Sequence, residues 1–412
     1  MVPVITMRAL FLVHNLPERG SYFRAREIAR RLAARGHDVT FVCTSEHKMY
    51  RPETRTADGL TLIESPNKTL FNDKQEGWGL FDNVTRLKLA KQQPWDLVFG
   101  FSHKPDCLFP GLEARRRGAK LVLDWSDWWG GPEGLYESCV IPSAPFQSLP
   151  RPIRWARRLV FRADARLESW AYEKADAAVL ISEEFLGHPG APEELELKSF
   201  VMHSGAPLDT IVPMAKPDAR AAMKLNIPTN AAVVGYIANF HTDERLLLEA
   251  FARTRAQCPE AVLLVAGGDF DRSDPALHAS IRDAVIHCGR IPFDKVGVFL
   301  GCADILALPL TDVALNRARY PHKLSDYVAA GRPIVASDVG ETGRLLRRFQ
   351  IGDLAPATPV GMGDALASLL RRQAEWDTLG QAVRQCAETQ FNWDEMCGKL
   401  FEFLGARLKL KF

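Results

Sequence analysis

GCADILALPLTDVALNRARYPHKLSDYVAAGRPIVASDVGE, residues 301–341, is the stretch that decides the fold. It predicts a buried strand over Asp304–Leu308, a polar loop, a helix that opens at Pro321, and a second strand over Pro333–Ser337. Proline favours the first turn of a helix, and Gly331 stands where a helix is expected to end. This order makes a βαβ unit, which brings ligands to the carboxyl ends of its strands. The N-terminus of the helix is therefore an expected anion site, with diphosphate as the commonest ligand.

The same alternation of strand and helix runs through both halves of the chain, which predicts parallel sheets covered on both faces. In the first half we predict strands over Arg8–Val13, Asp38–Cys43, Leu60–Glu64, Asp96–Phe101, Lys120–Leu123, Ala177–Ile181 and Phe200–Met202, and helices over Ser21–Arg35, Asp82–Lys91, Pro105–Arg117 and Ile153–Lys174. In the second half we predict strands over Val233–Ile237 and Ala261–Ala266, and helices over Glu244–Gln257, Pro275–Ile286, Gly343–Phe349, Gly363–Arg371, Glu375–Thr389 and Trp393–Leu410.

Composition is that of a soluble globular protein of two or more domains, with 412 residues, 47% hydrophobic and 25% charged. A net charge of +2 gives no field that favours nucleic acid. The eight cysteines form no C-x-x-C motif, which favours buried thiols in a reducing compartment. No apolar run reaches the roughly 18 residues of a membrane span. We therefore expect a cytoplasmic protein that binds no nucleic acid.

The run Pro321–Ala336, PHKLSDYVAAGRPIVA, resembles the donor-binding segment of family 4 glycosyltransferases. The resemblance implies a retaining enzyme of the α/β GT-B fold, with two Rossmann-like domains that face each other across a cleft. The proline-rich stretch Ser204–Pro228 predicts the boundary between them. The expected domains are an acceptor-side domain over residues 1–208, a nucleotide-sugar-binding domain over 209–390, and a last helix over 391–412 that crosses back to the first domain.

The start of the predicted helix supplies the main donor-binding candidates. Lys323 and the N–H groups around His322 and Leu324 are expected to stabilise the departing diphosphate. The alternative for Lys323 is a surface lysine, although a lysine there opposes the helix dipole. Asp326 stands where the family has a glutamate that contacts the ribose, and its alternative is a solvated aspartate in the first helical turn.

This chain departs from the family at Ala318, where a second acidic residue usually holds the sugar hydroxyls. Asn316, Arg317 or Arg319 is the expected substitute, and an arginine would favour a charged sugar or add charge beside the phosphates. The paired basic residues of the family, in a Gly-Arg…Lys-Gly pattern, are not plainly kept here. The further candidates for the donor site are Asn239, Arg245, Gly268, Arg290 and Ile291, with a place on the helix surface as the alternative for Arg245.

In the first half, the loop before the predicted helix at Ser21 resembles the family's diphosphate-covering loop, which makes Gly20 and Ser21 donor-binding candidates. Ser126 stands where the family often has a histidine, so Asp124 and Asp127 remain as groups that orient the sugar or activate the acceptor hydroxyl. Asp124 can instead cap a strand end. His103 is a further catalytic candidate, with capping of a helix as its alternative.

The resemblance implies no cofactor beyond the nucleoside-diphosphate sugar itself. Asp269-Phe-Asp271 spells the Asp-x-Asp of metal-dependent glycosyltransferases, but it lies in a second Rossmann half and not after an early strand. We therefore expect no metal site.

Arginines recur among apolar residues between Ile153 and Arg166. Tryptophan and phenylalanine beside arginine suit the anionic headgroups of lipids. The helix is therefore a candidate for peripheral contact with the inner face of the membrane. The alternative is a solvated helix face, since Asp164, Glu168 and Glu173 dilute the positive charge.

Together these features predict transfer of a sugar from a nucleoside-diphosphate sugar to a hydroxyl of a saccharide or lipid-linked acceptor. One alternative is another nucleotide-sugar enzyme of this fold, such as a 2-epimerase. The other is a nucleotide-sugar-binding protein that has lost catalysis, which Ala318 and Ser126 keep open.

Overall fold

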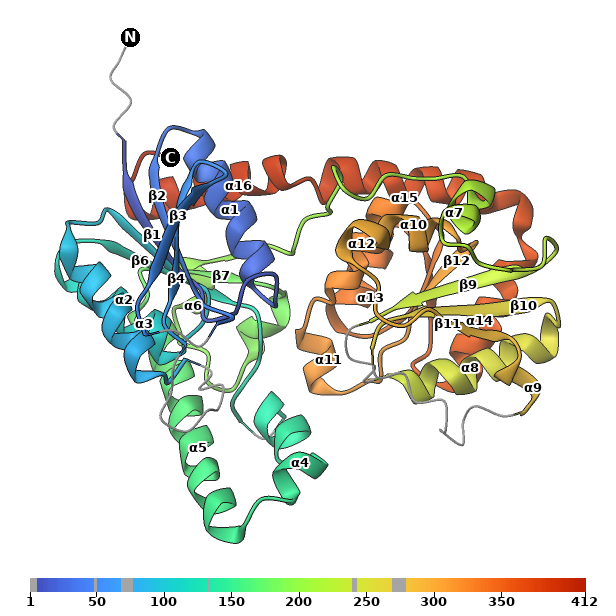
Figure 1. The fold of residues 1–412 in the computed structure, drawn as a ribbon, viewed down its shortest axis with the longest axis horizontal. Helices are drawn as coiled ribbons and strands as arrows, with labels where there is room; N and C mark the ends of the chain where they lie inside the picture. The colour runs from blue at the N-terminus through green and yellow to red at the C-terminus, as the bar shows by residue number, and fades with distance from the viewer. Residues whose placement is uncertain (1–5, 48–49, 68–76, 132, 239–242, 269–278) are drawn as a thin grey trace. The chain divides into compact units, whose positions relative to one another are not determined.

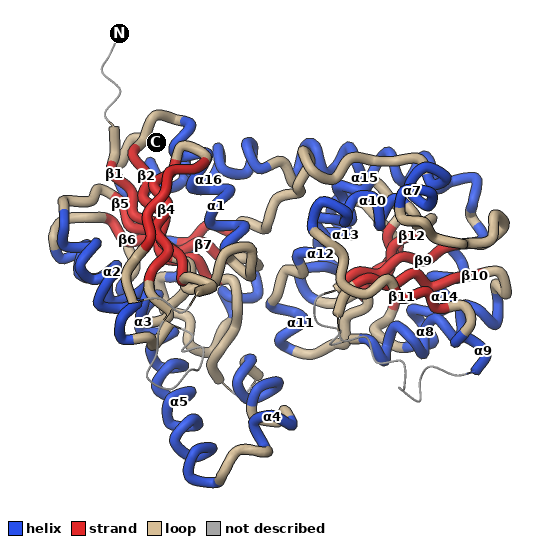
Figure 2. Tube along the Cα trace, viewed as in Figure 1, coloured by secondary structure: helices blue, strands red, loops and turns tan. Residues whose placement is uncertain are grey.

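The computed structural model describes residues 6–47, 50–67, 77–131, 133–238, 243–268 and 279–412. The chain forms two compact units. Unit 1 comprises the chain up to His203 together with Trp393–Phe412, and unit 2 comprises Ser204–Asn392. Figure 2 shows that the strands of each unit gather in one sheet with helices around it.

The sheet of unit 1 has the order β3-β4-β2-β1-β5-β6-β7-β8, and all its pairs are parallel except β3 with β4. Its strands are β1 (Arg8–Leu12), β2 (Asp38–Thr44), β3 (Glu53–Ala57), β4 (Leu60–Ser65), β5 (Leu97–Gly100), β6 (Lys120–Trp125), β7 (Ala177–Leu180) and β8 (Ser199–Val201). All the predicted strands of this half are present, within two residues at each end. Only β3 was missed, because its exposed sequence ETRTA carries no apolar alternation.

Helices cover both faces of this sheet, with α1 and α16 on one and α2 and α3 on the other (Figure 1). The helical elements are α1 (Tyr22–Ala34), α2 (Leu80–Gln92), α3 (Pro105–Arg116), η1 (Tyr136–Val140), α4 (Ala144–Gln147), α5 (Arg151–Lys174), η2 (Glu183–Gly187), α6 (Leu195–Lys198) and α16 (Trp393–Leu408). Ala25, Ile28 and Leu32 of α1 pack with Leu400 and Leu404 of α16 in one apolar cluster. The last helix is therefore part of the core of unit 1.

Unit 2 contains a parallel sheet of order β11-β10-β9-β12-β13-β14. Its strands are β9 (Ala232–Ile237), β10 (Ala261–Ala266), β11 (Val285–His287), β12 (Ile305–Leu308), β13 (Ile334–Ser337) and β14 (Asp353–Ala355). Its helical elements are α7 (Lys216–Ala222), α8 (Glu244–Gln257), α9 (Ala279–Arg282), η3 (Phe293–Lys295), α10 (Val296–Gly301), α11 (Ala314–Ala318), α12 (His322–Ala330), α13 (Gly340–Phe349), α14 (Pro359–Arg371), η4 (Gln373–Glu375) and α15 (Trp376–Gln390).

The βαβ unit predicted from residues 301–341 is present as β12, α12 and β13. Pro321 is the residue before the helix rather than its first residue, with φ −73° and ψ 116°. Gly331 ends the helix in the left-handed region at φ 62°, where a residue without Cβ is favoured. Two predictions beside it were wrong: the polar loop contains α11, and Val285 and Ile286 lie in strand β11 rather than in a helix.

Among the helices that the structure describes, none is both long and apolar enough to cross a membrane.

Candidate functional site

In unit 2, Lys323 lies in the first turn of α12. Its Nζ is 3.2 Å from the hydroxyl of Tyr236 and 4.3 Å from the centre of that ring, at the end of β9. Burial and the nearby charge of Arg319 lower the pKa of Lys323 to about 7. Within the described ranges no carboxylate lies at ion-pair distance from this ammonium group. The lysine thus contacts an aromatic ring, and Asp243, the acid whose charge acts on it, is not at ion-pair distance from it.

Asp243 connects the start of α8 to the segment before α12. Its carboxylate accepts hydrogen bonds from the backbone N–H of Thr311 (2.9 Å), the hydroxyl of Thr311 (2.8 Å) and the amide of Asn316 (3.1 Å). It also pairs with Arg319 at 3.0 Å, and it is 4% exposed. Sequence analysis missed Asp243, because an aspartate just before a helix is usually a cap. Here no cap hydrogen bond forms, and the side chain is used for these other contacts.

These contacts correct two predictions for the donor site. The amide nitrogen of Asn316 is fully engaged with Thr311 and Asp243, so its place is inside the loop rather than on a sugar. The positive charge of Arg319 is balanced by Asp243, which weakens the argument for a charged sugar. Arg319 still lies near Lys323 and adds to its electrostatic surroundings.

Asp326, one turn into α12, is half-buried and has no hydrogen-bond or ion-pair partner among the described residues. Burial raises the pKa of its carboxyl group to about 7. A half-buried carboxyl group that has no hydrogen-bond donor beside it can accept hydrogen bonds from the hydroxyl groups of a ligand.

The remaining donor-site candidates of unit 2 have different outcomes. Leu324 is fully buried and its N–H donates to the carbonyl of Pro321 at 2.9 Å, so that N–H is not offered to an anion. His322 is exposed at the helix start. Arg245 is 80% exposed and pairs with Glu249 at 2.8 Å, as expected for a surface residue of α8.

Gly268 and Arg290 are brought together after β10 and β11. A Cβ on Gly268 would lie 2.4 Å from Nε of Arg290, so only glycine allows this guanidinium to pack there. Ile291 is half-buried beside it. Asn239, and the Asp-x-Asp of Asp269 and Asp271, lie outside the described residues.

In unit 1, a narrow pocket lies at the carboxyl ends of β1, β5 and β6. It is lined by His14, Ser21, Phe101, Ser102, His103, Asp124, Trp125, Ser126, Asp127, Trp129 and Tyr172. The carboxyl end of a parallel sheet is where α/β proteins bind ligands. The pocket includes four of the residues predicted from sequence: Ser21, His103, Asp124 and Asp127.

The loop before α1 is closed by its own hydrogen bonds. Gly20 has φ +53°, and a Cβ there would lie 2.7 Å from the Asn15 amide. The N–H of Ser21 donates to Oδ1 of Asn15 at 3.1 Å, and the N–H of Tyr22 donates to Arg19. The predicted anion cradle at Gly20 and Ser21 therefore has fewer open N–H groups than expected.

The two aspartates of the pocket differ in their surroundings. Asp124 is 1% exposed, pairs with the buried Arg24 at 2.8 Å and accepts a hydrogen bond from Ser126. It lies within β6 and lines the pocket as a buried acid whose carboxylate is already paired. The side chain of Asp127 reaches solvent at the pocket mouth. Loss of hydration, followed by the negative charges of Glu168 and Asp124, raises the pKa of its carboxyl group to about 6.

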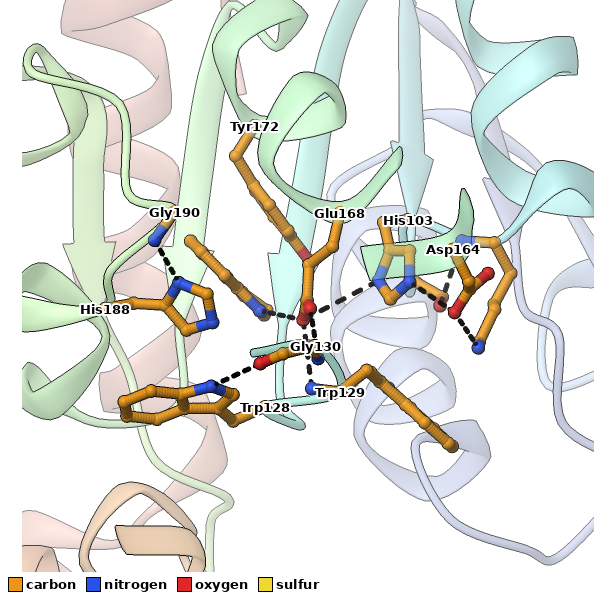
Figure 3. Close-up of polar contacts among 12 residues, drawn as sticks. His103, Trp128, Trp129, Gly130, Asp164, Glu168, Tyr172, His188 and Gly190 are labelled. Atoms are coloured by element: carbon orange, nitrogen blue, oxygen red, sulfur yellow. Dashed lines mark hydrogen bonds and ion pairs between the residues drawn. The ribbon is translucent and has the colours of Figure 1, made fainter. Parts of the chain in front are cut away.

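His103 lines the pocket, and its ring also contacts two buried acids of unit 1. Its Nε2 is 3.1 Å from Asp164 and its Nδ1 is 3.9 Å from Glu168, as Figure 3 shows. It does not cap α3 either, since Lys104 is the residue at that position. His103 is thus bound to the interior of unit 1 through Asp164, and its catalytic role stays a prediction.

Asp164 and Glu168 come from α5, and both are fully buried, whereas sequence analysis placed them on a solvated face. Asp164 accepts hydrogen bonds of 2.5 Å from Lys104 and from Tyr136. Burial alone would raise the pKa of Asp164, but the hydrogen bonds and charges of His103 and Lys104 lower it below its usual range.

Glu168 holds the loop of the pocket in place. It accepts hydrogen bonds from the Trp125 ring (2.9 Å) and from the backbone N–H groups of Trp129 (3.2 Å) and Gly130 (2.7 Å), as Figure 3 shows. A buried carboxylate with several donors is a rigid anchor. The loop that carries Asp127 is therefore well positioned.

Two family models match the chain. The Glycosyl transferase 4-like domain matches residues 19–188, in unit 1, and the Glycosyl transferases group 1 model matches residues 231–372, in unit 2. The chain belongs to the glycosyltransferases of the family 4 type. The second match includes Pro321–Ala336, so it confirms the family resemblance predicted for this glycosyltransferase from that run.

Solved structures confirm the GT-B class of fold. Sucrose-phosphate synthase from Thermosynechococcus elongatus superposes with a TM-score of 0.69 at 19% identity, over 97% of this chain and 99% of that one. The Anabaena protein HepE, in complex with UDP and glucose, gives a TM-score of 0.68 at 15% identity, over 97% of this chain and 100% of that one.

A curated relative matches part of the chain. It is a GDP-mannose-dependent phosphatidylinositol monomannoside mannosyltransferase of Mycobacterium tuberculosis, 24% identical over 164 residues. The match covers 38% of this glycosyltransferase and 43% of the relative, which is less than half the length of each.

Proposed function

We propose that this glycosyltransferase moves a sugar from a nucleoside-diphosphate sugar to an acceptor hydroxyl, with retention at the anomeric carbon. The observation that carries the proposal is Lys323, a partly dry cation at the start of α12 with no acidic partner among the described residues. An anionic ligand is the natural complement of such a site.

In the proposed reaction, unit 2 binds the donor. The bond from the anomeric carbon to the diphosphate breaks as the bond to the acceptor oxygen forms on the same face of the sugar. Negative charge grows on the departing diphosphate, which takes the acceptor's proton. Lys323 and the N-terminal dipole of α12 stabilise that charge, without a metal ion. Asp326 accepts hydrogen bonds from the ribose.

Unit 1 binds the acceptor in the pocket at the ends of β1, β5 and β6. Asp127 accepts a hydrogen bond from an acceptor hydroxyl at the pocket mouth. With a pKa of about 6, it is ionised above that pH and can take this role near neutrality. Glu168 keeps the loop of Asp127 in one conformation.

The test has two steps. A thermal-shift screen against UDP, GDP, ADP and TDP is expected to raise the melting temperature with one of them, since a ligand that binds only the folded state stabilises it. The matching nucleotide sugars, with acceptor extracts and with EDTA present, are then expected to give a product whose anomeric configuration NMR shows to be retained.

Each other outcome has a distinct meaning. Nucleotide binding without transfer or hydrolysis would support a binding protein that has lost catalysis. Conversion of the nucleotide sugar to its 2-epimer would support the epimerase. An inverted product, or loss of activity in EDTA, would contradict the mechanism.

We also propose that the exposed start of α5 contacts an anionic lipid surface at the inner face of the membrane, which suits a lipid-linked acceptor. Together with α4 this part of α5 extends away from the sheet of unit 1 (Figure 1). The run from residue 151 to 163 contains five arginines and no acidic residue. Its large exposed apolar side chains are Ile153, Trp155, Leu159 and Val160.

The burial of Asp164 and Glu168 strengthens this proposal, because it removes two of the three acids that would dilute the charge of the helix. An arginine near an anionic surface contributes about 1 kcal/mol. Phosphatidylglycerol vesicles are expected to sediment the protein at low salt, and phosphatidylcholine vesicles are not.

The variant W155A/R158Q is expected to bind phosphatidylglycerol at least tenfold more weakly. Arg116→Gln, which removes a well-exposed arginine of α3, is the matched control and should bind like the wild type. A wild-type protein that stays in the supernatant with both vesicles would contradict the membrane contact, and would leave the proposal for glycosyl transfer intact.

A further inference from the structure

His14 is the second residue after β1 and lies in the pocket of unit 1. Its backbone is held from both sides. Its carbonyl accepts a hydrogen bond from the Thr44 hydroxyl at 3.2 Å, and the carbonyl of the preceding Val13 accepts one from the buried Arg86 at 2.9 Å. The position of this histidine is thus fixed by the ends of two strands and by a buried arginine.

The orientation of the His14 ring follows from one contact. Nδ1 is 3.3 Å from the backbone carbonyl of Phe101. Because a carbonyl oxygen can only accept, Nδ1 must carry the proton, and in the neutral ring Nε2 then has a lone pair. Among the described residues Nε2 has no hydrogen-bond partner. It is also not one of the buried polar atoms that lack a partner, so Nε2 is accessible to a ligand or to solvent.

The charge of the ring is also fixed. Burial, followed by the positive charge of Lys104, lowers the pKa of His14 to about 3, and His103 and Arg86 add to this effect. The imidazole is therefore neutral near pH 7. A neutral ring whose Nδ1 donates to a carbonyl can accept a hydrogen bond at Nε2, and this ring lines the pocket.

The second histidine of the pocket has a different arrangement. Nε2 of His103 is 3.1 Å from Asp164 and donates to that carboxylate, and Nδ1 lies 3.9 Å from Glu168, beyond hydrogen-bond distance (Figure 3). Nδ1 of His103 thus faces a buried carboxylate, whereas among the described residues no carboxylate pairs with Nε2 of His14.

We propose that Nε2 of His14 accepts a hydrogen bond from the attacking hydroxyl of the acceptor and thereby orients its oxygen for transfer. The inference rests on the proposed function and adds a catalytic residue to it. His14 does not take the proton of the acceptor hydroxyl. That proton leaves with the diphosphate. A polar site that recognises a hydroxyl discriminates strongly against a misaligned or missing one.

Two substitutions separate this role from a structural one. An asparagine places an N–H near the position of Nδ1, and so keeps the bond to the Phe101 carbonyl without an acceptor at Nε2. A glutamine places its amide near Nε2, and so keeps an acceptor there. His14→Asn is expected to lower kcat/KM for the acceptor by about 10- to 100-fold, and His14→Gln by less than about fivefold.

The controls are the affinity for the nucleoside diphosphate and the melting temperature, which should change little in either variant. The inference is overturned if His14→Asn transfers as well as the wild type, or if it transfers as well as His14→Gln, since the bond to Phe101 would then be what matters. A wild-type protein that transfers no sugar would refute the proposed function, and this role with it.

Discussion

The two units differ in how they treat buried charge. Buried ion pairs of unit 1 include Arg24–Asp124, Arg86–Asp82, Arg86–Asp106 and Lys104–Asp164. In unit 2, Lys323 and Asp326 are partly buried, and neither has a partner of opposite charge within ion-pair distance among the described residues. Paired charges line the pocket of unit 1, whereas the charges of Lys323 and Asp326 in unit 2 are available to a ligand under the proposed function. Unit 2 has paired acids as well, in Asp243 and Asp304, so the contrast concerns the two residues at the start of α12.

The largest effect is expected from breaking a pair in unit 1. Asp164→Ala leaves Lys104 buried without its carboxylate, which costs about 3–5 kcal/mol. Chemical denaturation followed by hydrogen exchange should show the loss in unit 1. Asp127→Ala, which removes a carboxyl group that reaches solvent in the same pocket, is the control and should change stability little. Equal stability of the two variants would mean that the buried pair does not stabilise unit 1.

An intermediate effect is expected in unit 2, on binding rather than on folding. Lys323→Met should weaken nucleoside-diphosphate binding by at least tenfold, about 1.4 kcal/mol, while the melting temperature stays equal or rises. Calorimetric titration measures the affinity. Lys295→Met, at an exposed lysine of the same unit, is the matched control. A variant that loses stability but keeps its affinity would place Lys323 with the structural charges of unit 1.

The smallest effect concerns Asp326 and pH. Its pKa of about 7 in the folded state lies above that of an unfolded aspartate, so the folded state binds the proton more tightly. This group therefore contributes stability below about pH 4, and loses it as the pH rises to 7.

Asp326→Asn removes this dependence. The variant should be more stable than the wild type by about 1–2 kcal/mol at pH 8, with no difference below about pH 4. Its nucleotide affinity should fall, because the asparagine is a weaker acceptor for the ribose. Denaturation at several pH values measures the first effect and titration the second. A stability difference that does not vary with pH, or an unchanged affinity, would contradict this account of Asp326.

The parts of the fold that depend on apolar pattern were predictable. The strands and helices around Gly331 follow from periodicity and from helix-end residues, and Glu244–Gln257 was predicted to the residue. The edge strands β3, β11 and β14 were missed, because they are short or exposed and carry little apolar alternation.

The site was harder to predict, because burial of a polar residue depends on partners that are distant in the sequence. Glu168 seemed to be a surface acid, but its donors lie some 40 residues earlier, in Trp125 and Gly130. The sequence does not distinguish His14 from His103. They differ in their partners, because His103 contacts two buried carboxylates and His14 contacts one backbone carbonyl. Asp243 likewise acquires its role from Thr311 and Arg319, far along the chain.

Helix α16 joins the core of unit 1 through Trp393, Leu400 and Leu404, although it follows all of unit 2 in the sequence. The ribosome therefore delivers every strand of the first sheet, and α1, long before the last helix of their shared apolar cluster. Unit 2 is one continuous segment. During synthesis, unit 2 can therefore complete its core first. Unit 1 keeps the part of its apolar surface that α16 covers exposed until residue 393 and its successors emerge.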